Sequence, residues 1–216
     1  MGAVTNAGTA AALGEAILAE LAGGHEEAKP TRSAIVGAAV ESFADRGFHG
    51  TNLKHIAQGS GLSTAALYVH FASKEELLFA LSRRGHEIAL DMVTAAAGVA
   101  DAVTAARVFV YAFTRWHAEQ RTLARVVQYE LGALRAEHAD VITDLRRDTE
   151  KSVRGLVERG VGSGDFVVPD VRGAAAAILS LGIDVARWYT PHSPWTPHEL
   201  GVLYIEFASR LLGVRG

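Results

Sequence analysis

Hydrogen-bond donors of several chemical kinds are concentrated between positions 51 and 74 of this 216-residue chain. They are the hydroxyl, phenol, imidazole and ammonium groups of Thr51, Ser63, Thr64, Tyr68, His70 and Lys74. Such groups bind phosphate oxygens, and hydroxyls also reach the edges of bases in a groove of double-stranded DNA. This chemistry requires local structure that brings the donors to one face.

Capping signals divide this segment into short helices. Thr51 is a plausible N-cap for a helix that ends near Gly59, and Ser63 is a plausible N-cap for the next helix. Ser73 and Glu76 form the S-x-x-E pattern of a capping box, which predicts the start of a third helix. Two short helices joined by a glycine-containing turn are typical of a helix-turn-helix, whose second helix enters the major groove of DNA.

The start of the second short helix offers Ser63, Thr64, Ala65 and Ala66 to base edges. Hydroxyl and methyl groups can touch bases, but no Arg, Asn or Gln stands there for bidentate recognition. We therefore expect modest direct readout from this helix, with phosphate contacts supplying much of the affinity.

A second set of residues is expected to fix phosphates. Its members are Thr51, Tyr68, His70 and Lys74, and Lys54 completes the predicted DNA-binding set. Lys74 also stands at the N-terminus of a helix, where free N–H groups favour an anion. The alternative for Tyr68 and Phe71 is that both are core aromatics; we predict a core position for Phe71 and a phosphate contact for Tyr68.

Charge is distributed unevenly along the chain. The net charge is −3, yet residues 31–84 contain six Lys and Arg residues against four Asp and Glu residues. This local excess is compatible with a DNA partner. The N-terminal residues lack the basic start of a secretory signal, and no apolar run approaches the roughly 18 residues of a membrane span. We expect a soluble cytoplasmic protein.

Catalytic and metal-binding patterns are missing from the sequence. There is no cysteine, which excludes disulfides, thiolate zinc sites and a cysteine nucleophile. The nine histidines form no H-E-x-x-H motif, and the segment 162–165 is neither a phosphate-binding loop nor a nucleophile elbow. We therefore expect no enzyme activity, no metal and no cofactor, with a helical enzyme as a remote alternative.

Helical periodicity and capping signals predict an all-α chain of nine or ten helices. The predicted domains are an N-terminal extension over 1–29, a three-helix DNA-binding domain over 30–84 and a helical domain over 85–216. The extension is predicted to be a mobile tail, with a short ordered helix as the alternative. Later helices are predicted to begin at the caps Asp101, Asp170 and Thr196, and glycines 160–164 are predicted to end the helix before them.

Residues 31–78 resemble the DNA-binding domain of the TetR family of repressors. The matching residues are Ala38-Ala39, Phe43, Gly47, Thr51, Ile56-Ala57, Gly61-Leu62-Ser63, Leu67-Tyr68, His70-Phe71 and Ser73-Lys74-Glu75-Glu76-Leu77. One departure is Ser60, where an alanine commonly precedes the glycine of the turn. The resemblance implies a homodimer that binds a palindromic DNA operator, with two recognition helices about one DNA turn, roughly 34 Å, apart.

The resemblance also implies that the second domain binds a small-molecule effector and dimerises. The predicted pocket residues are Phe109, Phe113, Trp116, Val127 and Leu131, with core packing as the alternative role of these aromatics. The last two helices are predicted to pair with their symmetry mates through Ile178, Leu181, Val185, Trp188, Leu203 and Phe207. Arg115, His117 and Arg121 are candidates to meet anionic parts of an effector, or else form a solvated face.

A second pattern bears on the effector. It consists of Ala186-Arg187-Trp188-Tyr189, Pro191, Pro194, Pro197, Glu199-Leu200, Tyr204 and Leu212-Gly213. It is similar to a subgroup of TetR repressors of fatty-acid or steroid breakdown that sense acyl-CoA thioesters. The alternative is an efflux regulator that senses a cationic or aromatic drug, for which Glu130 and Asp184 are the candidate buried carboxylates.

Overall fold

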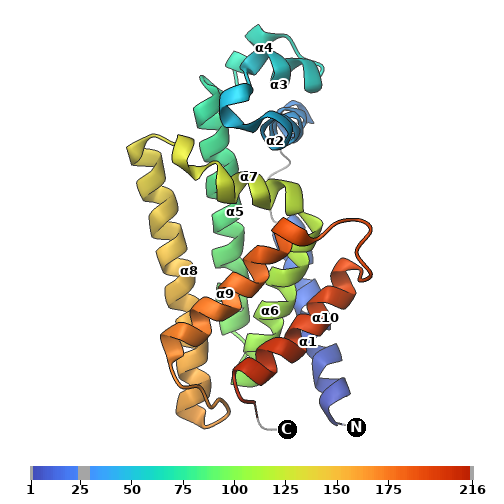
Figure 1. Ribbon diagram of the computed structural model, residues 1–216, viewed down its shortest axis with the longest axis vertical. Coiled ribbons are helices and arrows are strands. Elements are labelled where there is room, and N and C mark those ends of the chain that lie inside the picture. The colour runs from blue at the N-terminus through green and yellow to red at the C-terminus, as the bar shows by residue number, and fades with distance from the viewer. Residues whose placement is uncertain (1, 24–29, 215–216) are drawn as a thin grey trace. The chain divides into compact units, whose positions relative to one another are not determined.

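The computed structural model describes residues 2–23 and 30–214, and within them every regular element is a helix (Figure 1). The ten α-helices there are α1 Gly2–Gly23, α2 Pro30–Gly50, α3 Leu53–Gly59, α4 Thr64–Tyr68, α5 Lys74–Ala97, α6 Ala102–Glu119, α7 Arg121–Tyr129, α8 Ala136–Ser163, α9 Val171–Trp188 and α10 Pro197–Leu211. A short 3₁₀ helix, Leu131–Ala133, follows α7. The all-α prediction is confirmed. None of these helices combines the length and apolarity that crossing a membrane requires.

The chain forms two compact units. Unit 1 comprises Met1–Gly23, Ile88–Arg121 and Arg146–Gly216, and unit 2 comprises Gly24–Glu87 and Thr122–Leu145. This grouping differs from the contiguous division 1–29, 30–84 and 85–216, chiefly at two places. The first helix groups with unit 1, and the segment containing α7 and the start of α8 groups with unit 2.

Unit 2 is built around one hydrophobic core. Each of its helices contributes a single apolar face, as spacings of three and four residues dictate. The large buried residues of this core are Ile35, Phe43, Ile56, Leu67, Leu77 and Leu78. Helix α7 adds Val126, which is 3% exposed. Phe71 is buried in the same core, as predicted.

Helix α6 is the central element of unit 1. Its buried residues lie on every side and include Phe109, Tyr111 and Phe113. Such a helix needs partners all round. Helices α1, α9 and α10 supply them, and Figure 1 shows these helices beside α6.

The N-terminal helix α1 replaces the predicted mobile tail, because residues 2–23 are helical. Ala7, Ala10 and Ala11 are buried in the core of unit 1. A Cβ on Gly14 would lie 2.5 Å from the ring of Tyr111, so only glycine allows this approach. Ile17, Leu18 and Leu21 also pack against this core, so α1 combines closely packed small residues with a short stripe of large apolar residues.

A polar cluster also fixes α1 to unit 1. The buried Tyr111 donates its hydroxyl proton to the Glu15 carboxylate at 2.8 Å. Arg115 donates to Glu15 at 2.8 Å, and Nδ1 of His198 lies 2.8 Å from the Tyr111 oxygen. Burial and the neighbouring Glu15 carboxylate raise the pKa of Tyr111 to about 12. The phenol therefore stays protonated and available as a donor.

Capping signals locate most helix starts. Asp101, Asp170 and Thr196 are the N-caps of α6, α9 and α10, as predicted. The predicted stop at glycines 160–164 is wrong in part, since α8 continues to Ser163. A Cβ on Gly160 would lie 2.1 Å from the Phe166 ring, so this glycine permits a close approach rather than a break. The left-handed Gly164, at φ +82°, ends the helix.

Candidate nucleic-acid interface

A glycine break ends the long first helix of unit 2. Gly47 has φ +66°, a left-handed conformation, and Phe48 beyond it stacks on Phe43 with 5.8 Å between ring centroids. The Thr51 hydroxyl lies 2.8 Å from the carbonyl oxygen of Ser42 and 2.9 Å from that of Gly47. A hydroxyl has one proton, and here it is directed to helix carbonyls in a buried position. Thr51 therefore fixes the end of α2, and this geometry leaves no proton for the predicted phosphate contact.

The N-cap of α3 is Asn52, not the predicted Thr51. The Asn52 side chain accepts a hydrogen bond from the backbone N–H of His55 at 2.9 Å. Nδ1 of His55 accepts in return from the backbone N–H of Asn52 at 3.4 Å. Imidazole here takes the place that glutamate or glutamine usually takes in a capping box. The sequence signal was the S/T/D/N preference at an N-cap, which Thr51 and Asn52 both satisfy.

The turn between α3 and α4 has the features that its glycine predicts. Gly61 has φ +70°, and the backbone N–H of Leu62 donates to the carbonyl oxygen of Ala57 at 2.9 Å. The Ser63 hydroxyl oxygen accepts from the backbone N–H of Ala66 at 3.1 Å, which confirms Ser63 as the N-cap of α4. The segment 53–68 is thus two short helices joined by a tight turn.

The outer side of this segment carries most of the predicted DNA-binding residues. Leu67 is fully buried and anchors α4, while Lys54, Ser63, Ala65 and Tyr68 are exposed. Thr64, Ala66 and His70 are partly exposed. These seven residues are therefore accessible, and Thr51 is not.

Two further residues at this surface were missed by the sequence analysis. Val69 follows α4 and is 82% exposed, the largest exposed fraction among the exposed large hydrophobic residues of the described chain. Its position four residues after Ala65 places it on the same helix face as Ala65, and this spacing could have identified it in the sequence. The Arg32 guanidinium lies 5.0 Å from the centroid of the Phe71 ring and brings a positive charge near the end of α4.

Lys74 has a structural role that its sequence position did not reveal. Its ammonium donates to the carbonyl oxygens of Phe48 at 2.6 Å and Thr51 at 2.9 Å. It also lies 4.2 Å from the centroid of the Phe48 ring. An ammonium has three N–H bonds, so one donor remains for a phosphate. Lys74 thus ties the start of α5 to the turn after α2.

The predicted capping box at the start of α5 is shifted by one residue. The Ser73 hydroxyl oxygen accepts from the backbone N–H of Glu76 at 3.1 Å, as expected. The Glu76 carboxylate accepts from the backbone N–H of Ala72 at 2.9 Å rather than from that of Ser73. Both interactions fix the short connection that follows α4.

Glu75 connects the start of α5 with the start of α8 inside unit 2. Its carboxylate accepts from the backbone N–H of Arg135 at 3.0 Å and from Nδ1 of His138 at 2.8 Å. The His138 ring stacks on Phe79 with 3.7 Å between centroids. Burial raises the pKa of Glu75, but these hydrogen bonds outweigh it and hold the pKa below its ordinary value.

Family models match both parts of the sequence. The model described as bacterial regulatory proteins, tetR family, matches residues 35–81. The model described as tetracyclin repressor-like, C-terminal domain, matches residues 103–212, just over half of the chain. The chain belongs to the TetR family.

Curated relatives and solved structures agree with this membership. UidR of Escherichia coli is 44% identical over 64 residues, which are 30% of this chain and 33% of UidR. The repressor KstR2 of Mycobacterium tuberculosis is 28% identical over 182 residues, 81% of this chain and 88% of KstR2. A tetR-family regulatory protein from Rhodococcus RHA1 is 40% identical, with a TM-score of 0.79 over 88% of this chain and 100% of that one. AibR, solved in complex with isovaleryl coenzyme A and operator DNA, is 19% identical, with a TM-score of 0.75 over 87% of this chain and 100% of AibR.

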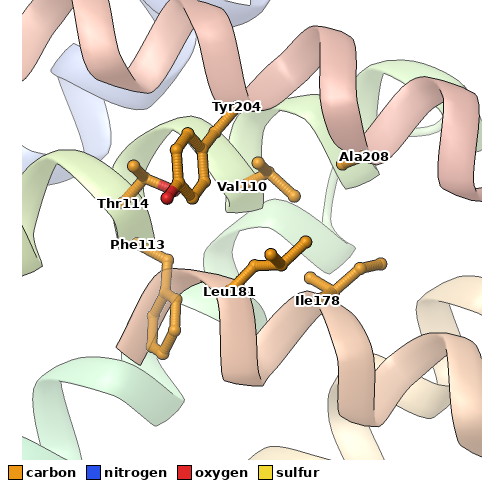
Figure 2. A pocket seen from close by; sticks show the side chains of 7 residues that line it. All are labelled: Val110, Phe113, Thr114, Ile178, Leu181, Tyr204 and Ala208. Carbon is orange, nitrogen blue, oxygen red and sulfur yellow. The ribbon is translucent and has the colours of Figure 1, made fainter. Parts of the chain in front are cut away.

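Unit 1 of this TetR-family chain contains a small cavity between α6, α9 and α10 (Figure 2). It is lined by Val110, Phe113, Thr114, Ile178, Leu181, Tyr204 and Ala208. Its volume of about 10 Å³ corresponds to roughly one water molecule. The lining is apolar except for the hydroxyls of Thr114 and Tyr204.

The structure does not gather the predicted pocket residues in this cavity. Of the five, Phe113 alone lines it. Phe109 is 1% exposed in the core of unit 1, and Trp116 packs against that core. Val127 and Leu131 belong to unit 2. Phe109 and Phe113 therefore fill the core, as the alternative reading of the aromatics expected.

Three of the residues predicted to contact an effector, Asp184, Arg115 and His117, have partners within the chain. Asp184 forms an ion pair with Arg187 at 2.6 Å, and this hydrogen bond lowers the pKa of Asp184. Arg115 pairs with Glu119 at 2.7 Å in addition to Glu15. His117 is buried, with Nδ1 2.8 Å from the carbonyl oxygen of Phe113. Asp184 and Arg115 are thus neutralised locally, and His117 is directed to its own helix.

The predicted dimerisation residues fall into two groups. Leu181, Trp188 and Phe207 are 38%, 36% and 44% exposed, and Leu203 is partly exposed. Ile178 and Val185 are 5% and 0% exposed, since they pack inside unit 1. The first group is available to a second copy of the chain, and the second group is not.

Proposed function

We propose that this chain is a transcriptional repressor that binds a palindromic DNA operator as a homodimer. A small hydrophobic effector, a fatty-acyl or steroid-derived CoA thioester, releases it. The observation that carries the DNA part is the exposed face of α4, a short helix anchored by the buried Leu67 and preceded by the tight turn at Gly61. A helix presented in this way fits the major groove.

Roles within this surface follow from donors and exposure. Lys54, Tyr68, His70 and the remaining N–H of Lys74 contact phosphates. Residues 63–66 face base edges. Phosphate contacts fix the register of the helix but carry no sequence information, so the two groups have separate effects on affinity and specificity.

Dimerisation rests on the exposed apolar side chains of α9 and α10. Leu181, Trp188 and Phe207 form the group that a twofold partner would cover. Exposed groups of large apolar residues mark interaction surfaces. A twofold axis there would present two copies of α4 to successive turns of the DNA, about 34 Å apart.

The effector class rests on two relatives and on the apolar interior of unit 1. KstR2 is described in its solved structure as a ketosteroid transcriptional regulator, and AibR was solved with isovaleryl coenzyme A. The cavity of about 10 Å³ between α6, α9 and α10 holds no acyl chain, so an effector that binds there must open the core around α6. A ligand that favours the opened form shifts the dimer away from its DNA-binding geometry. A coupling of about 1–3 kcal/mol gives a roughly 5–150-fold loss of operator affinity. The pairing of Asp184 with Arg187 gives no support to a cationic effector.

Selection of bound duplexes from a random-sequence pool tests the DNA part. The purified chain should enrich a palindromic site whose half-sites are about one helical turn apart. Tyr68→Phe should weaken binding of the dimer about 30-fold, since each subunit loses one hydrogen bond of about 1 kcal/mol. Tyr129→Phe is the matched control, because Tyr129 is a 62% exposed tyrosine on α7. Failure to enrich any sequence over non-specific DNA would refute the proposal.

Thermal-shift measurements test the effector part. Acyl-CoA and steroid-CoA thioesters should raise the melting temperature and release the selected duplex, while free CoA and the free acids should do so weakly. Cationic dyes are measured in the same way for comparison. Stabilisation by the dyes, and by no thioester, would replace the proposed effector with the cationic alternative.

A further inference from the structure

The outermost side of α4 carries two apolar side chains, Ala65 and Val69. Residues four apart lie on the same face of a helix, and Leu67, midway between them, points into the core. Val69 is the C-cap of α4 with φ −66° and ψ −27°, so helical geometry extends to it. Ala65 is exposed and Val69 is 82% exposed.

Polar residues lie next to this apolar centre on one side of α4. Tyr68, which is 54% exposed, and the partly exposed Thr64 are four residues apart and so lie together beside it. A single exposed valine needs no explanation on a protein surface. Here, however, the valine stands in the centre of the surface that the proposed function directs into the major groove. Neither Ala65 nor Val69 can donate or accept a hydrogen bond through its side chain.

One group on the major-groove edge of unmodified base pairs suits such a surface. Thymine presents its C5-methyl group there, and apolar side chains make contact with it. Burial of one methyl group changes affinity about fourfold.

We propose that Val69, next to Ala65, contacts the C5-methyl group of a thymine in each operator half-site and thereby supplies direct sequence readout from α4. This inference rests on the proposed function, since it requires α4 to enter the major groove. It differs from the hydroxyl contacts proposed for Ser63 and Thr64 and from the phosphate contact of Tyr68, because it recognises a methyl group and no hydrogen-bonding atom.

A deoxyuridine scan of the selected duplex tests the inference. Deoxyuridine pairs like thymidine but lacks the C5-methyl group. Each thymine of one half-site is replaced in turn, and affinity is measured for the full-length chain. We expect one or two positions at which the wild-type chain binds the thymine duplex about fourfold more tightly than the deoxyuridine duplex.

The Val69→Ala variant assigns the contact to its residue. At the sensitive position its preference for thymine should fall from about fourfold to near one, because the methyl group has lost its partner. Val161→Ala is the matched control: Val161 is an exposed valine of α8 in unit 1, and its truncation should leave the fourfold preference intact. Val69→Thr keeps one methyl group and should show an intermediate preference.

The outcomes separate this inference from the proposed function. If the wild-type chain enriches an operator but is indifferent to every deoxyuridine, the methyl contact is overturned while DNA binding stands. An unchanged thymine preference in Val69→Ala would also overturn it, and Val69→Thr decides the matter if Val69→Ala binds too weakly to measure. If no duplex is enriched at all, the proposed function itself has failed.

Discussion

The ammonium of Lys74 donates a hydrogen bond of 2.6 Å to the carbonyl oxygen of Phe48, 26 positions earlier in the chain. It connects the first residue of α5 with the turn after Gly47, and the Phe48 ring covers the same ammonium. The segment between these two residues contains α3 and α4. Lys74, which the sequence indicates only as a phosphate ligand, therefore also holds together the two ends of the segment that contains α3 and α4.

Lys74→Ala is expected to lower the free energy of unfolding by about 1.5–3 kcal/mol, the range for a hydrogen bond to a charged group. The carbonyl groups of Phe48 and Thr51 lose their donor in this variant. Thermal unfolding followed by circular dichroism measures the effect. Lys151→Ala is the control, because Lys151 is an exposed lysine of α8. If both variants melt like the wild-type chain, the structural role of Lys74 is wrong.

Lys54→Ala should show the opposite pattern. Lys54 is exposed on α3, so its loss should leave the melting temperature unchanged. A lysine that neutralises one phosphate contributes about one to the slope of log affinity against log salt concentration. We expect the slope to fall by about one for each subunit, with similar losses on operator and non-specific DNA. An unchanged slope would remove Lys54 from the phosphate-binding set.

Local signals predicted much of the fold. The caps Ser63, Asp101 and Thr196 act through neighbours in sequence, so the sequence predicted their roles without the tertiary structure. The start of α5 was also predicted, because a capping pattern begins it.

Tertiary contacts account for what the sequence did not predict. The Thr51 hydroxyl is directed to Ser42, a partner that no spacing rule identifies. In α9 the apolar residues surround the helix, so the pattern could not tell that Val185 packs inside the chain while Leu181 is exposed. In α1 the role of Gly14 depends on its close approach to the ring of Tyr111, which no local pattern indicates.

The Glu75 carboxylate gives unit 2 a pH-dependent stability. Burial raises the pKa of Glu75, but the hydrogen bonds from Arg135 and His138 lower it by a larger amount. The resulting pKa lies below the ordinary value of 4.5. A carboxylate with a lowered pKa stabilises the fold above its unfolded pKa. That contribution is lost as pH falls through the folded pKa, below 4.5.

Glu75→Gln should therefore be less stable than the wild-type chain at neutral pH, and the difference in melting temperature should shrink as pH is lowered below about 4.5. Melting curves between neutral and acidic pH measure this. Glu137→Gln, a change at an exposed carboxylate in the first turn of α8, is the control. A difference that stays constant across this pH range would show that the Glu75 charge contributes nothing.

Only the exposed members of the predicted dimer interface can contact a second subunit. Introducing a charged side chain at these positions therefore tests dimerisation. Leu181 and Phe207 are 38% and 44% exposed. The proposed twofold contact would bury each of them in both subunits. Replacing either residue with glutamate removes about 1.5 kcal/mol or more of stabilisation by apolar burial in each subunit, which weakens the dimer about 100-fold or more.

Leu181→Glu and Phe207→Glu should therefore be monomeric in analytical ultracentrifugation at micromolar concentration, while their circular dichroism spectra stay helical. Val161→Glu, at a 40% exposed valine of α8, should remain dimeric. Dimers in all three variants would place the interface elsewhere, because a carboxylate cannot enter an apolar contact without that loss.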